Sequence, residues 1–129
     1  MGVVIDKAYT HRLLGCAYNV HTALGPGLLE SVYEAALVHE LRSQGFDVKH
    51  QVPVKVRYKE IELDVDLRLD IIVDDSVILE LKSVNEIQPV HHKQLLTYMR
   101  LTGTKLGYII NFNVEALRDG IERVINGYW

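Results

Sequence analysis

Two mostly apolar runs flank a polar turn in residues 68–83, RLDIIVDDSVILELKS. Short apolar runs of this kind are typical of buried strands. Three ionisable residues interrupt them: Asp70 lies in the first run, and Glu80 and Lys82 lie in the second. Burying such groups near a core is costly unless they are paired or hold an ion. We therefore treat these three residues as candidates for a functional site.

The three side chains are expected to converge at one place. Side chains alternate along a strand, so Glu80 and Lys82 point to the same face. A turn over residues 74–76 would place Asp70 roughly opposite Glu80. Two carboxylates and a backbone carbonyl, such as that of Leu81, form a hard-oxygen site suited to Mg²⁺ or Mn²⁺. A neighbouring lysine can orient a water, as metal-assisted phosphodiester hydrolysis requires. The alternative is a structural ion pair between Asp70 and Lys82.

The composition indicates one globular domain over residues 1–129. The chain is 48% hydrophobic and 24% charged, which is ordinary for a soluble protein. It has no apolar run near the roughly 20 residues of a membrane span. It also has no recognisable secretory signal, so we expect a cytoplasmic protein. The net charge of −3 argues against binding nucleic acid through bulk positive charge, although a local groove remains open.

Hydrophobic periodicity predicts the element order ααβββαβα. The predicted helices cover Asp6–Leu24, Leu28–Ser43, Ile87–Leu101 and Val114–Ile125. The predicted strands cover Phe46–Tyr58, Ile61–Val73, Val77–Ser83 and Lys105–Phe112, and the first three form a meander. Pro53 favours an edge position for the first strand. The helix between the last two strands implies a crossover, so these strands should be parallel. The expected fold class is α/β or α+β, a mixed central sheet flanked by helices.

Three motifs carry a resemblance to a known group of proteins. Asp70, followed on the next strand by residues 80–82, Glu-Leu-Lys, resembles the signature of the PD-(D/E)XK nuclease superfamily. Gln94 and Tyr98, four residues apart on the following helix, resemble the Q-x-x-x-Y pattern of its RecB-like branch. Residues 27–33, GLLESVY, resemble the motif that names the GxxExxY protein family of the same superfamily. The resemblance covers nearly the whole chain.

This resemblance implies a restriction-endonuclease-like fold and a metal-dependent nuclease. It implies Asp70, Glu80 and the Leu81 carbonyl as ligands of Mg²⁺ or Mn²⁺, and Lys82 as the group that positions the nucleophilic water. The implied partner is nucleic acid, with DNA favoured over RNA. One position departs from the pattern, because Leu69 stands where the superfamily has its eponymous proline.

The resemblance also implies accessory roles for Glu30, Gln94 and Tyr98, and Glu30 is a further candidate metal ligand. Each has a structural alternative. A carboxylate in the first turn of a helix, as at Glu30, offsets the helix dipole. Gln94 can be a surface amide, and Tyr98 can be a core residue. For Tyr33, packing is expected rather than chemistry.

The competing functional class is a catalytically silent module with the same fold. Such a module would use its cleft, or an oligomer surface, to bind nucleic acid or a protein. Homo-oligomer formation is left open by the sequence. A zinc site at His91 and His92 is not expected, because adjacent residues on a helix point about 100° apart.

Overall fold

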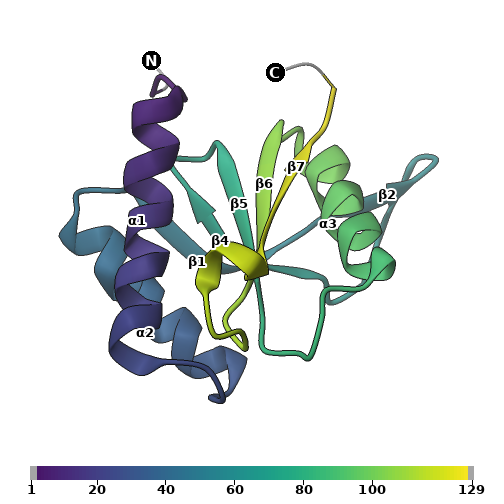
Figure 1. Cartoon of the computed structure of the whole chain (residues 1–129). Helices are drawn as coiled ribbons and strands as arrows, with labels where there is room; N and C mark the ends of the chain where they lie inside the picture. The colour runs from purple at the N-terminus through teal and green to yellow at the C-terminus, as the bar shows by residue number, and fades with distance from the viewer. Residues whose placement is uncertain (1–2, 128–129) are drawn as a thin grey trace.

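A five-stranded mixed sheet forms the centre of the molecule (Figure 1). The structure is a computed structural model that describes residues 3–127. The strands in spatial order are β1 (Val48–Pro53), β4 (Arg68–Val73), β5 (Val77–Lys82), β6 (Leu106–Asn111) and β7 (Ile121–Ile125). β5 and β6 are parallel, and the other neighbouring pairs are antiparallel. The predicted mixed sheet and parallel crossover are confirmed. The predicted domain, 1–129, includes residues 1–2 and 128–129, which lie outside the described residues.

Helices cover both faces of this sheet (Figure 1). They are α1 (Lys7–Leu24), α2 (Glu30–Ser43) and α3 (Pro89–Thr102). The Asp6 side chain accepts a hydrogen bond from the Tyr9 backbone N–H (2.9 Å) and caps α1. α3 has proline in its first turn and ends at Gly103, whose φ is 71°. All three helices match their predicted positions closely. No helix within residues 3–127 has the length and hydropathy to cross a membrane.

Two apolar clusters fill the space between the helices and the sheet. The cluster on the α1 and α2 side includes Leu13, Leu37, Ile71, Leu79 and Phe112. The cluster on the α3 side includes Ile78, Leu95, Met99 and Ile109. Because both faces are covered, the central strands read as continuous apolar runs, and all six residues of β6 are buried.

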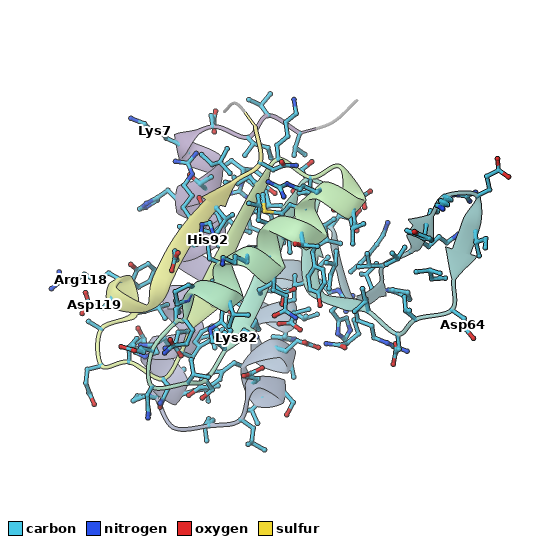
Figure 2. All side chains as sticks on the ribbon, turned by 90° about the vertical axis from the view of Figure 1, so that its right-hand side faces the viewer. Lys7, Asp64, Lys82, His92, Arg118 and Asp119 are labelled. Atoms are coloured by element: carbon cyan, nitrogen blue, oxygen red, sulfur yellow. The ribbon has the colours of Figure 1, made fainter. Side chains whose placement is uncertain are left out.

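The predicted meander is wrong in its first two strands, each of which is divided in two. The middle pieces form a separate hairpin, β2 (Val56–Tyr58) with β3 (Ile61–Leu63). Figure 2 shows this hairpin, with Asp64 beside it, projecting from the rest of the molecule. β1 ends at Pro53, which has no N–H with which to continue the ladder. β1 is an edge strand of the sheet, as Pro53 predicts.

The predicted last helix, Val114–Ile125, is also wrong. This segment forms a short 3₁₀ helix, η1 (Leu117–Gly120), and then β7, which is antiparallel to β6. Three of the five residues of β7 are β-branched and suit a strand. β7 also covers an edge of β6 that would otherwise be unpaired. A Cβ atom at Gly120 would collide with the Asn111 carbonyl oxygen, so glycine permits the close approach before β7.

Candidate functional site

Two acidic side chains open the end of the β4–β5 hairpin that lies away from its turn. The strands pair regularly as far as Ile71, which lies opposite Leu79. One residue further, the Asp70 backbone N–H donates to Glu80 Oε1 (3.2 Å), and the Leu81 N–H donates to Asp70 Oδ2 (2.8 Å). Carboxylate oxygens thus take the place of backbone carbonyls in the ladder. The structure brings Asp70 and Glu80 together, as alternation along the two strands predicts.

The acid pair holds protons more tightly than ordinary carboxyl groups. Glu80 is only 7% exposed, and this burial, followed by the negative charge of Asp70, raises its pKa to about 8. Burial also raises the pKa of Asp70, although the Leu81 N–H opposes the shift. A pair of this kind favours a bound proton or cation over two uncompensated charges.

Lys82, which is labelled in Figure 2, is the last residue of β5 and follows Glu80 by two residues along this strand. Its side chain is half-buried, and its positive charge lowers the pKa of both Asp70 and Glu80. Within the described part of the chain, however, Lys82 forms no ion pair of 4.0 Å or less. The structural ion pair between Asp70 and Lys82 is therefore not formed.

Glu30 contacts the chain just beyond the acid pair. Its Oε2 accepts a hydrogen bond from the Ser83 N–H (3.3 Å), and the Ser83 hydroxyl donates to the Leu28 carbonyl (2.6 Å). The negative charge of Glu30 also raises the pKa of Asp70, although burial of Asp70 is the largest cause and Glu30 the smallest. Glu30 is the first residue of α2, so it also offsets the helix dipole. Together these contacts fasten the loop before α2 to the residue that follows Lys82.

Two buried polar side chains secure the loops around the site. The Tyr33 hydroxyl donates to the Gly25 carbonyl and accepts from the Leu28 N–H (3.2 Å). Asn111, which is fully buried, bonds both backbone groups of Val84, the N–H at 3.1 Å and the carbonyl at 2.9 Å. Tyr33 has the packing environment that we expected for it. The Asn111 contacts hold the chain directly after the Lys82 strand.

On α3, Gln94 and Tyr98 contact each other. Gln94 Nε2 donates to the Tyr98 hydroxyl (3.1 Å), as their spacing along one helix face allows. Tyr98 is 8% exposed and belongs to the α3-side core, whereas Gln94 is exposed. Among residues 3–127, neither makes a hydrogen bond to the acid pair. Their accessory roles stay predictions.

A cleft of about 480 Å³ leads to Asp70. Its lining residues are Glu30, Ser31, Glu34, Gln51, Asp70 and Leu81. Sequence reasoning missed Glu34 and Gln51. Glu34 lies one helical turn after Glu30, a spacing that could have identified it. Gln51 carries no comparable signal, because its place at the cleft depends on the pairing of β1 with β4.

The oxygen atoms at this site fit a hard divalent cation. Asp70 and Glu80 offer carboxylates, and Leu81 offers a backbone carbonyl. In the part of the chain that the structure describes, no three His, Cys, Asp or Glu side chains are grouped to hold a metal. Mg²⁺ usually binds through one or two carboxylates and takes its other ligands from water and substrate phosphates. The two-carboxylate arrangement suits Mg²⁺ or Mn²⁺ in that mode.

Comparison with known proteins gives a family match over most of the chain. Residues 7–124 match the family model of the PD-(D/E)XK nuclease superfamily, whose members typically use divalent metals. The match extends from α1 into β7 and includes the hairpin that carries the acid pair. No curated protein and no solved structure matches the chain. The chain belongs to the PD-(D/E)XK nuclease superfamily.

Proposed function

We propose that this protein is a Mg²⁺- or Mn²⁺-dependent nuclease that hydrolyses phosphodiester bonds in nucleic acid, with DNA favoured over RNA. One observation carries the proposal: Asp70 and Glu80 meet at the opened end of the hairpin, with Lys82 beside them. Superfamily membership supports the same reaction class.

In this proposal, each residue has a defined task. Asp70, Glu80 and the Leu81 carbonyl would hold the cation, which supplies a Lewis acid and lowers the pKa of bound water. Lys82 would orient the attacking water and stabilise the negative charge that develops on the phosphate. The water oxygen would form a bond to phosphorus and release a proton to solvent, while the bond from phosphorus to the leaving oxygen breaks and that oxygen takes up a proton from solvent.

We also propose that the protein belongs to the GxxExxY family within the superfamily. Supporting contacts come from the motif residues themselves. Tyr33 secures the loop at Gly25, and Glu30 reaches the Ser83 N–H. The motif would thus serve to dock the start of α2 on the strand that carries Lys82.

The test is a cleavage assay on single- and double-stranded DNA and RNA with Mg²⁺ or Mn²⁺. Lys82→Ala should lower the cleavage rate by at least about 100-fold, because it removes a group that acts on the water. Substrate affinity should change little, since only one positive charge is lost. Lys49→Ala is the matched control, because Lys49 pairs with Asp75 at the other end of the hairpin (3.1 Å). It should leave cleavage unchanged.

Two results would count against the proposal. Cleavage by Lys82→Ala at the wild-type rate would place the activity elsewhere or in a contaminant. Wild-type protein that binds nucleic acid but cuts none of these substrates would support the catalytically silent module instead. Affinity would then depend steeply on salt concentration.

A further inference from the structure

Two side chains of β1 hold Glu34 at the cleft. Gln51 Nε2 donates to Glu34 Oε1 (2.7 Å), and His50 Nδ1 lies 3.2 Å from Glu34 Oε2. The Glu34 side chain is 15% exposed. A glutamate on a solvated helix face ordinarily samples several rotamers, and ordering it costs conformational entropy. Here both carboxylate oxygens have a partner on a neighbouring strand, so Glu34 is held in one orientation.

Gln51 itself adopts an unusual backbone conformation at a significant place. His50 lies opposite Ile71 and Val52 opposite Leu69, so Gln51 occupies the position opposite Asp70. Its φ is 52°, in the left-handed region that residues other than glycine rarely adopt. Such conformations persist where the surroundings enforce them, and they gather at functional sites. Gln51 therefore lies opposite Asp70 on the neighbouring strand and at the same time bonds Glu34.

We propose that Glu34 is a positioning residue that orders the water ligands of the cation at Asp70 and Glu80, and that Gln51 holds Glu34 in place for this task. The inference rests on the proposed function. Glu34, Gln51 and Asp70 line the same cleft. Mg²⁺ keeps several of its waters, so a carboxylate beyond direct reach can bind it through them.

The test measures Mn²⁺ affinity by isothermal titration calorimetry, together with the melting temperature of each variant. Glu34→Gln and Gln51→Gly should each weaken Mn²⁺ binding by about tenfold, the scale seen when a group behind the metal ligands is lost. Gln51→Gly separates positioning from folding, because glycine accepts the positive φ. Its melting temperature should equal or exceed that of wild type while its affinity falls.

Two control variants match these changes. Lys59→Gly replaces another left-handed residue (φ 57°) in the β2–β3 hairpin, and it should leave Mn²⁺ affinity unchanged. Glu40→Gln removes a carboxylate of α2 that instead bonds Asn19 (2.9 Å), and it should also bind Mn²⁺ as wild type does.

Three outcomes would overturn the inference. Wild-type affinity in both Glu34→Gln and Gln51→Gly would show that Glu34 does not act on the cation. A loss of affinity accompanied by a lower melting temperature in Gln51→Gly would show a structural role alone. Wild-type protein that binds no Mn²⁺ would remove the proposed nuclease function as well. The first two results leave that function standing, so the two failures are distinguishable.

Discussion

The two ends of the β4–β5 hairpin each carry a pair of acidic residues, and their surroundings differ. At the turn, Asp74 accepts hydrogen bonds from the Tyr9 hydroxyl (2.7 Å) and the Asp47 N–H (3.0 Å). Asp75, next to it, pairs with Lys49 (3.1 Å). Both aspartates of the turn therefore have donors from other parts of the chain, and their role is structural.

At the open end, the acids face each other. Asp70 and Glu80 receive one backbone N–H each, and burial raises the pKa of both. The positive charge of Lys82 lowers the pKa of both acids, although Lys82 forms no ion pair with either of them. A fold can satisfy acidic residues with donors from other parts of the chain, as the turn shows. An acid pair that is left buried with so little compensation is therefore a candidate functional site.

The largest expected effect comes from neutralising the open end. Asp70→Asn with Glu80→Gln should lower the cleavage rate by at least about 10³-fold, because the charges that hold the cation are lost. The metal-free variant should nevertheless be at least as stable as wild type at pH 8, since the substitutions remove buried negative charge. Cleavage rates and urea denaturation measure the two effects. Asp75→Asn at the turn is the control and should cut normally; equal losses in both variants would erase the difference between the two ends.

In the absence of metal, the stability of wild type should depend on pH differently from that of Glu80→Gln. The pKa of Glu80 is about 8 in the folded protein and 4.5 in its ordinary environment. The folded state therefore binds the proton more tightly, and stability falls as pH rises between these values. The contribution of Glu80 to this slope should approach about 1.4 kcal/mol per pH unit, and this contribution should be absent from Glu80→Gln. Denaturation curves across this window check the prediction. Parallel curves for the two proteins would mean that Glu80 ionises normally.

Mg²⁺ should stabilise the folded protein by binding at the open end of the hairpin and not at the turn. A cation that binds only the folded protein raises its stability by mass action, about 1–3 kcal/mol for concentrations well above Kd. Thermal melts with millimolar Mg²⁺ should show this rise in wild type and in Asp75→Asn. The rise should vanish in Asp70→Asn with Glu80→Gln. A shift of the same size in all three proteins would place the cation elsewhere.

A smaller effect is expected at the turn. Asp74→Ala should lower the free energy of unfolding by about 1–2 kcal/mol, because the buried Tyr9 hydroxyl and the Asp47 N–H lose their acceptor. It should leave the Mg²⁺-induced rise intact. Urea denaturation with and without Mg²⁺ tests both statements. A variant that lost the magnesium effect would show that the two ends of the hairpin are coupled.

Local patterns in the sequence predict much of this molecule. The three helices follow from apolar spacing and from end signals such as Asp6 and Gly103, which act within a few residues. The meeting of Asp70 with Glu80 is equally local, because one short turn and the alternation of side chains set it. That is why the central residues of the candidate site could be named in advance.

The remaining features depend on contacts between distant parts of the chain. Residues 114–125 show an acceptable helical pattern, yet the exposed edge of β6 and the close approach of Gly120 to Asn111 select a strand. Gln51 reaches the cleft only because β1 pairs with β4, and Glu34 takes its orientation from that strand. The sequence by itself determined the helices and the acid pair, since short-range spacing dictates them. Only the tertiary structure decided the last strand, the place of Gln51 at the cleft and the orientation of Glu34, because long-range pairing sets all three.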